Sequence, residues 1–148
     1  PAALEPSGKD YFETYPKVKE YMDSLVEMGK SKGYVTSLYG RRRPIPELSA
    51  KNFMQRQFGE RIAMNSPIQG TAADIIKIAM NRVDARLRKE NMQSRLILQI
   101  HDELLVETKI EEIEEVSHIL NEEMIHAAAL KVPLIADVKQ GTTWYEAK

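Results

Sequence analysis

Apolar residues recur at helical spacing in several stretches of this chain. In residues 16–32 they fall at i, i+3, i+4, i+7 and i+8 and form one face: Val18, Tyr21, Met22, Leu25 and Val26. Gly33 favours the end of that helix. Residues 110–130 carry a similar face, formed by Ile110, Ile113, Val116, Leu120, Met124 and Ala127. We therefore predict a helix over each of these two stretches.

Between these stretches, the pattern predicts two further helices separated by a break. The first covers residues 49–65, and Asn65-Ser66-Pro67 ends it. Ser66 then caps the second helix, with Pro67 at its first position and Gln69 at its third, which is an S-x-x-Q capping box. The second helix carries a long apolar stripe: Ile68, Ala72, Ile75, Ile76, Ala79, Val83 and Leu87.

Two segments rich in β-branched, leucine and aromatic residues predict hairpins. Residues 33–47, GYVTSLYGRRRPIPE, favour a short hairpin whose second arm lies at an edge, because it contains two prolines. Residues 95–108 favour a second hairpin, in which Leu96–Ile100 and Leu104–Val106 flank a polar tip. That tip consists of His101, Asp102 and Glu103.

The remaining predictions concern the two ends of the chain. Residues 133–138, PLIADV, favour a final strand. Residues 1–9, PAALEPSGK, are spotted with Pro, Gly and Ser, and we expect a loose leader there. The combination predicts an α+β fold, with long helices packed on a small antiparallel sheet.

Composition narrows the class of protein. The 148 residues suffice for one domain, and 43% apolar with 29% charged residues is an ordinary globular mixture. The absence of cysteine excludes disulfide scaffolds, thiolate metal sites and cysteine nucleophiles. The apolar runs are too short to cross a bilayer, and no signal peptide precedes them, so we expect no membrane association. The first residue is Pro1, so either an initiator was trimmed or the chain begins inside a longer one.

Charge is uneven along the chain although its total is −1. Residues 30–95 carry fourteen Lys and Arg against five acids, whereas residues 96–148 carry four Lys against eleven acids. A basic middle suits a polyanionic partner. Charges that merely decorate exposed helix faces give the same counts, and the near-zero total favours that simpler interpretation when charge is considered alone.

Two clusters carry candidate chemistry. Asp102 and Glu103 offer hard oxygen ligands that suit Mg²⁺, although acids in a polar turn are common and usually inert. Neighbouring strand residues point to opposite faces, so a two-metal site needs a further carboxylate from elsewhere. Arg41-Arg42-Arg43 suits phosphate binding and equally suits an edge strand protected by charge.

Two long motifs resemble the C-terminal end of family A DNA polymerases, particularly the bacterial ones. They are MNSPIQGTAADIIKIAM at Met64–Met80 and LQIHDELLVE at Leu98–Glu107. The segments YFETYPKVKEYMD, GYVTSLYGRRRPIPE and VPLIADVKQGTTWYEAK match the family in the same order. The resemblance covers residues 11–148 as a single incomplete domain and leaves residues 1–10 as an unmatched leader. It implies a partial palm subdomain with part of the fingers.

The resemblance also implies roles for individual residues. Asp102 matches the palm carboxylate that binds the catalytic Mg²⁺ ions, and Glu103 matches a supporting acid. Primer–template contacts are implied for His101 and Gln99 near the primer 3′ end, for Arg61, Asn65 and Gln69, and as weaker phosphate contacts for Arg41, Arg42, Lys51 and Arg56. Gln69 has a competing interpretation as the capping-box residue.

Two family motifs are not found in this sequence: a strand resembling D-Y-S-Q-I-E with the first metal-binding aspartate, and the R-x-x-x-K-x-x-x-F-x-x-x-Y-G fingers helix. We therefore expect the chain to belong to a polymerase that uses primer–template DNA, deoxynucleoside triphosphates and Mg²⁺ in replication and repair, in the bacterial cytoplasm at the nucleoid. We expect the isolated chain to be inactive, and its exposed apolar surface to produce oligomers as an artefact. The alternatives are a non-catalytic nucleic-acid-binding remnant and a small helical interaction protein.

Overall fold

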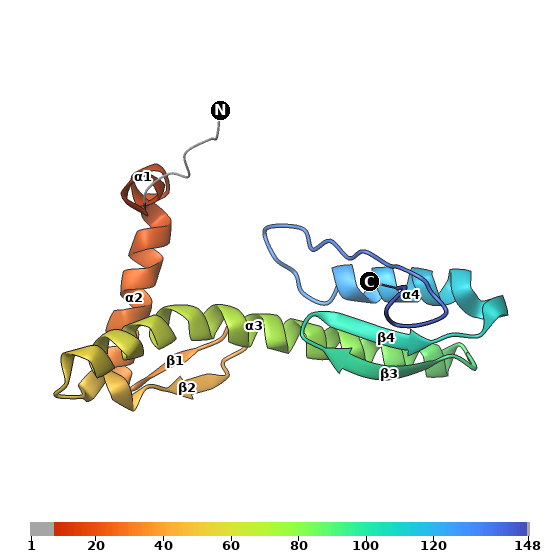
Figure 1. Ribbon diagram of the computed structural model, residues 1–148, viewed down its shortest axis with the longest axis horizontal. Helices are drawn as coiled ribbons and strands as arrows, with labels where there is room; N and C mark the ends of the chain where they lie inside the picture. The colour runs from red at the N-terminus through yellow and green to blue at the C-terminus, as the bar shows by residue number, and fades with distance from the viewer. Residues whose placement is uncertain (1–7, 148) are drawn as a thin grey trace. The chain divides into compact units, whose positions relative to one another are not determined.

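The computed structural model describes residues 8–147 and divides the chain into two compact units, residues 1–71 and 72–148 (Figure 1). Most of the predicted leader lies outside the described residues, and residues 8 and 9 already belong to helix α1 (Gly8–Thr14). Helix α3 (Phe53–Lys89) contributes to both units. None of the helices within residues 8–147 combines the length and hydropathy needed to span a membrane.

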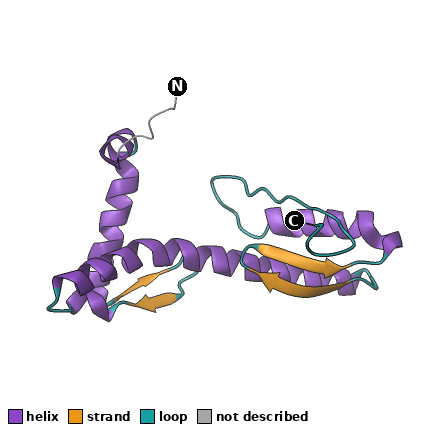
Figure 2. Ribbon diagram, viewed as in Figure 1, coloured by secondary structure: helices purple, strands orange, loops and turns teal. Residues whose placement is uncertain are grey.

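The first unit contains two helices, a small hairpin and the first part of α3 (Figure 2). Helix α2 (Pro16–Lys32) ends at Gly33, whose left-handed φ of 75° lets its N–H bond to the carbonyl of Gly29 at 2.9 Å. Strands β1 (Tyr34–Thr36) and β2 (Arg42–Pro44) pair antiparallel, and a 3₁₀ turn η1 (Pro46–Ser49) follows. This confirms the helix and the hairpin predicted for this part of the chain.

The core of the first unit is small and depends on a close approach of backbones. Its buried members are Val35, Ile45, Leu48 and Ala63. A methyl group at Gly59 would stand 2.9 Å from the backbone nitrogen of Leu48 and 3.0 Å from the Cβ of Glu47. Glycine at this position therefore lets α3 lie directly against η1.

The predicted break at Ser66-Pro67 is wrong, because α3 continues through it as one helix of 37 residues. The φ of proline suits a helix, but the interior position loses the hydrogen bond that a residue 67 N–H would give to the Ala63 carbonyl, and the ring crowds that carbonyl. Ala63 and Pro67 are both buried, so packing on this face offsets that cost. The side chains of Ser66 and Gln69 make no hydrogen bond with other described residues, so the capping box is not formed.

The second unit packs a hairpin and a helix on the rest of α3. Strands β3 (Arg95–Ile100) and β4 (Glu103–Glu107) pair antiparallel, and after a turn η2 (Ile110–Glu112) the chain forms α4 (Ile113–Ile125). Four residues form the buried core: Val83, Leu87, Val116 and Ile119. Hairpin residues Leu96, Leu104 and Val106 pack against it. The predicted hairpin, C-terminal helix and α+β class are confirmed.

The final strand predicted at residues 133–138 is wrong, because these residues form no strand. A strand requires a backbone partner, and this segment is instead held by a side chain: the Asn121 amide donates to the carbonyl of Ala136 at 3.0 Å. Pro133 also lacks a donor, and Ile135 is 87% exposed. The strand was predicted from the local pattern of residue types alone.

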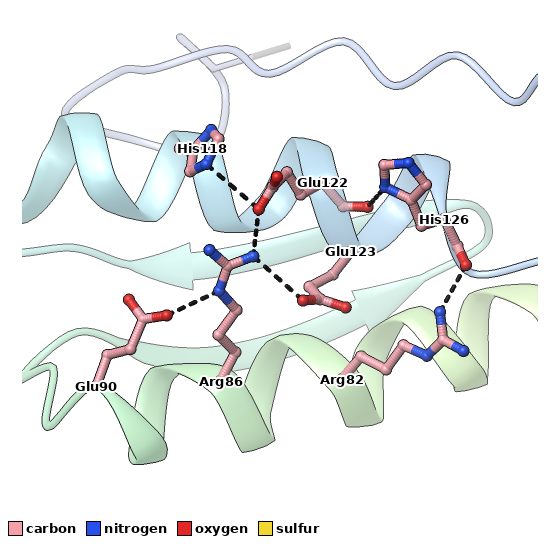
Figure 3. A network of polar contacts seen from close by, with 7 residues as sticks. All are labelled: Arg82, Arg86, Glu90, His118, Glu122, Glu123 and His126. Carbon is pink, nitrogen blue, oxygen red and sulfur yellow. Dashed lines mark hydrogen bonds and ion pairs between the residues drawn. The ribbon is translucent and has the colours of Figure 1, made fainter.

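A polar network joins α3 to α4 (Figure 3). The Arg86 guanidinium donates to Glu90 at 2.8 Å, to Glu122 and to Glu123 at 3.3 Å, and hydrogen bonds to Glu90 and Glu122 raise its pKa. The Arg86 contact correspondingly lowers the pKa of Glu122. Arg82 donates to the carbonyl of His126, the C-cap residue of α4, at 2.5 Å. These bonds fix α4 on α3 over the hairpin.

Two glycine substitutions in α3 test the close packing at η1. Gly59→Ala forces a methyl group against backbone atoms, so we expect destabilisation by about 1–3 kcal/mol in thermal or urea unfolding. Gly70→Ala is the matched control, because its methyl group would meet Ser37 Cβ at an ordinary 3.4 Å. There we expect stabilisation of about 1 kcal/mol from helix propensity. Equal effects of the two substitutions would contradict the packing described above.

Candidate functional site

A basic cavity lies in the first unit between the β1–β2 hairpin and α3. Its volume is about 710 Å³. Six of its lining residues carry guanidinium or amide groups: Arg41, Arg42, Arg43, Arg61, Asn65 and Gln69. Five of these were predicted as primer–template contacts from the family resemblance, whereas Arg43 was predicted only as part of the candidate phosphate-binding run Arg41-Arg42-Arg43. The Arg41-Arg42-Arg43 run contained the signal for Arg43, because consecutive residues around a hairpin turn can share one cavity.

The helical part of this cavity is an ordered row. Arg61, Asn65 and Gln69 stand four residues apart on α3, so they follow one another along one side of the helix. The row exists because α3 is continuous at Pro67. All three side chains are exposed, and each presents donors toward solvent.

Aromatic rings lie beneath two of the guanidinium groups. Arg42 stacks over Tyr34, with its Cζ 4.9 Å from the ring centroid, and Arg61 lies 6.0 Å from the centroid of Phe58. Such cation–π contacts restrict the side chain while leaving its N–H groups available. Arginines held in this way suit planar, bidentate recognition of phosphate.

Two further predicted contacts do not line the cavity. Lys51 is exposed in the loop before α3. Arg56 donates from Nη1 to the carbonyls of Ala50 and Lys51 at 3.0 and 2.8 Å, and its Cζ lies 5.9 Å from the Phe53 ring centroid. The structure therefore gives Arg56 a local role in closing the loop before α3.

The predicted carboxylate cluster lies at the tip of the β3–β4 hairpin in the second unit. Ile100 pairs with Glu103, so His101 and Asp102 form the two-residue turn and Glu103 begins β4. His101 adopts a left-handed φ of 49°, which is costly for a residue with a side chain. The Gln99 amide donates to the His101 carbonyl at 2.8 Å and holds the turn in this form.

An irregularity in β3 changes which side chains face the core before the tip. Leu96 pairs with Val106, but Leu98 pairs with Leu105, so Ile97 is an extra residue on this strand. Such bulges bend a strand and re-aim its side chains, and they are frequent beside functional sites. Ile97 and Leu98 are 55% and 39% exposed, so the bulge leaves apolar surface uncovered in this unit.

Asp102 and Glu103 are exposed, and neither side chain forms a hydrogen bond or ion pair with another residue of the described range. They line a cavity of about 400 Å³ together with Asp137 and Trp144, which sequence reasoning missed. No group of three His, Cys, Asp or Glu residues able to hold a metal occurs among residues 8–147. Two unengaged carboxylates fit the one or two protein oxygens that Mg²⁺ commonly takes. They do not by themselves form a two-metal site.

The open end of the hairpin is anchored by Glu112. Its carboxylate accepts hydrogen bonds from the backbone N–H of Gln93 at 3.0 Å and of Ser94 at 2.8 Å, and from the Ser94 hydroxyl at 2.5 Å. The Gln93 and Ser94 hydrogen bonds lower the pKa of Glu112. Glu112 thus fixes the start of β3 against η2.

In the C-terminal segment, the hydroxyl and N–H of Thr142 donate hydrogen bonds to the Glu146 carboxylate and similarly lower its pKa.

Comparison with known proteins identifies the class. The model of the family described as DNA polymerase family A matches residues 5–146. The chain therefore belongs to DNA polymerase family A, and the resemblance found in the sequence is confirmed.

Individual relatives agree with this assignment. DNA polymerase I of Geobacillus stearothermophilus is 53% identical and that of Bacillus caldotenax 52% identical over 138 residues, which are 93% of this chain and 16% of each relative. The polymerase domain of Pol1 from M. smegmatis, solved in complex with DNA primer-template and dNTP, is 41% identical with a TM-score of 0.91. That match covers 94% of this chain and 24% of the solved one. The chain thus spans only a small part of its relatives.

Glu112 gives a pH-dependent prediction. Its pKa in the folded chain is lower than the ordinary value of 4.5, so its stabilisation is complete above that value and lost as the pH falls through the folded pKa. We expect Glu112→Gln to lower Tm near neutral pH and to converge with the unaltered chain in acid. Glu114→Gln is the control, because the Glu114 side chain is exposed and makes no described hydrogen bond. A Tm difference that stays constant into acid would contradict this account.

Proposed function

We propose that this chain forms the C-terminal part of the polymerase domain of a DNA-directed DNA polymerase, which transfers nucleotides to a primer 3′ end. The observation that carries the proposal is Asp102: in a family A chain, it lies exposed and without a described partner at the tip of a hairpin. A carboxylate in that state is available to a metal ion and to substrate. Membership of this family gives no support to a small helical interaction protein.

Asp102 is the metal-binding carboxylate in this proposal, and Glu103 is a supporting acid. Mg²⁺, when bound, would supply stabilisation of the charge on the attacking and leaving oxygens. The protein's part is to hold Asp102 in place. The paired strands, the left-handed His101 and the Gln99 amide bond support that role, because they define the turn. A second metal-binding aspartate has to come from another segment.

Primer–template DNA is the proposed partner of the basic cavity. Arg41 and Arg42 would contact phosphates, which position a duplex without reading its sequence. Asn65 and Gln69 would hydrogen-bond minor-groove acceptors, whose pattern is largely shared among base pairs, so these contacts test pairing geometry. The unengaged Gln69 side chain supports DNA contact over helix capping. The M. smegmatis polymerase domain was solved with primer-template and dNTP, which supports both as partners.

The remaining assignments follow from the same proposal. His101 and Gln99 would lie near the primer 3′ end, Arg61 beside the template duplex, and Lys51 and Arg56 would be secondary phosphate contacts. The protein would act in replication and repair in the bacterial cytoplasm at the nucleoid. The isolated 148-residue chain would not polymerise, because one carboxylate motif without a triphosphate-binding helix places neither metal ion firmly.

A non-catalytic nucleic-acid-binding module is the second candidate. The observation that favours it is the location of the basic cavity entirely within residues 1–71, whereas the carboxylates belong to residues 72–148. Binding by this cavity therefore does not require Asp102. Activity, rather than binding, separates the two functions.

A segment exchange tests the catalytic role. We would replace the corresponding segment of Geobacillus stearothermophilus DNA polymerase I with this chain and measure primer extension. The exchanged enzyme should extend primers, and Asp102→Asn should lower kcat by about a thousandfold or more, because the metal loses a charged ligand. Glu107→Gln is the control, since Glu107 is an exposed acid on the same strand, away from the tip.

Two outcomes would contradict this proposal. One is a folded exchanged enzyme that extends primers equally well with Asp102→Asn. The other is template-dependent, Asp102-dependent extension by the isolated chain, which would overturn its predicted inactivity. A folded exchanged enzyme that binds primer–template but never extends it would favour the second candidate.

Salt dependence tests the basic cavity. We expect the isolated chain to bind a primer–template duplex with an affinity that falls as the salt concentration rises. When the logarithm of the binding constant is plotted against the logarithm of the salt concentration, each phosphate that the protein neutralises makes the slope steeper by about 0.9. Arg42→Gln should reduce both the slope and the affinity. Arg88→Gln is the matched control, because it removes an exposed arginine of α3 that pairs with Asp84 and does not line the cavity. Equal effects of both variants would indicate non-specific charge attraction.

A further inference from the structure

The side-chain hydroxyl of Thr71 joins the hairpin loop of the first unit to α3. It donates to the carbonyl of Pro67 at 2.6 Å, one helical turn earlier, and accepts from the backbone N–H of Leu38 at 2.9 Å. Hydroxyls in helices often bond back to such a carbonyl. The hydrogen bond that the hydroxyl accepts from Leu38 is not local, because it comes from a loop 33 residues away. It links this loop to α3, and we call this link the tether.

The tethered loop leads directly to the arginines of the cavity. The Ser37 N–H donates to the Arg41 carbonyl at 2.9 Å, and the Ser37 hydroxyl accepts from the Arg41 N–H at 3.2 Å. Gly40, with φ of 79°, completes the turn between them. Leu38 lies inside this turn, so fixing its N–H fixes the backbone on which Arg41 stands.

The other end of the tether lies beside the amides of the cavity. Thr71 and Pro67 bracket Gln69, and Ser37 Cβ would be 3.4 Å from a methyl group at Gly70. Loop and helix are therefore in near contact at the point where the hydroxyl joins them. The cavity is bounded by these same two segments.

We propose that Thr71 is a positioning residue for nucleic-acid binding, whose hydroxyl sets the place of Arg41 and Arg42 relative to Asn65 and Gln69. The inference rests on the proposed function, because it assumes that the basic cavity receives DNA. Thr71 itself makes no contact with DNA in this account. Its effect passes through the loop backbone.

The test separates the hydroxyl from the shape of the side chain. Thr71→Val keeps the branched, half-buried shape and removes both hydrogen bonds, whereas Thr71→Ser keeps the hydroxyl. Hydrogen exchange of the Leu38 amide reports the tether without any DNA. Primer–template affinity, measured on the same full chain, reports its consequence. Ser24→Ala is the control, because it removes a hydroxyl-to-carbonyl bond within α2 that holds no loop.

We expect Thr71→Val to speed exchange at Leu38 by about tenfold, since Leu38 is 66% exposed and its N–H would open to water. Affinity for primer–template should fall about fivefold to tenfold, the effect of one lost hydrogen bond. Thr71→Ser should restore both values, and Ser24→Ala should change neither.

The outcomes distinguish this inference from the proposed function. Unchanged Leu38 exchange in Thr71→Val would overturn the tether, whatever the DNA result. Faster exchange with unchanged affinity would overturn the positioning role. Failure of the unaltered chain to bind primer–template would overturn the proposed function and the DNA role of Thr71 with it, while the exchange data would still decide whether the tether exists.

Discussion

Helical continuity through Pro67 is the constraint on which both units depend, because α3 supplies part of each core. Before the proline, Ala63 is buried against Leu48 and η1; after it, Val83 and Leu87 form the core with α4. Continuity also aligns Arg61, Asn65 and Gln69 along one side of the helix. The candidate interface therefore depends on α3 remaining one helix despite the hydrogen bond that is lost at Pro67.

Local strain and irregularity gather around the candidate site at the tip of the β3–β4 hairpin. The turn at the end of β3 places a histidine in the left-handed region, and the same strand carries an extra residue at Ile97. Each feature costs stability compared with a regular hairpin, and neither contributes a buried side chain at the tip. What they produce is a narrow, defined turn with Asp102 exposed at its end. The packing of the rest of the hairpin, where Leu96, Leu104 and Val106 contact the core, offsets this loss of stability.

The sequence predicted those elements whose signals are local. Helices α2 and α4 and both hairpins follow from spacing, β-propensity and turn residues. It failed where packing or pairing with another segment decides: α3 continues through the buried Pro67, and residues 133–138 form no strand because no backbone among residues 8–147 pairs with them. Candidate site residues within motifs were proposed through the family resemblance. Asp137 and Thr71 were not, because only folding brings Asp137 to the hairpin cavity and Thr71 to the loop.

The fold also separates the charges in the basic middle of the chain into two groups. Several of its charges are engaged internally: Arg86 by three glutamates, Arg88 by Asp84, and Lys30 by Glu60. For these residues, decoration of helix surfaces is a sufficient explanation. Arg42, Arg43 and Arg61 differ, because they line one cavity and pair with no carboxylate of the described chain. The electrostatic potential that a polyanion meets at this surface is set by such unneutralised local charges and not by the net charge of the whole chain. A net charge of −1 therefore does not weaken the case for a nucleic-acid interface.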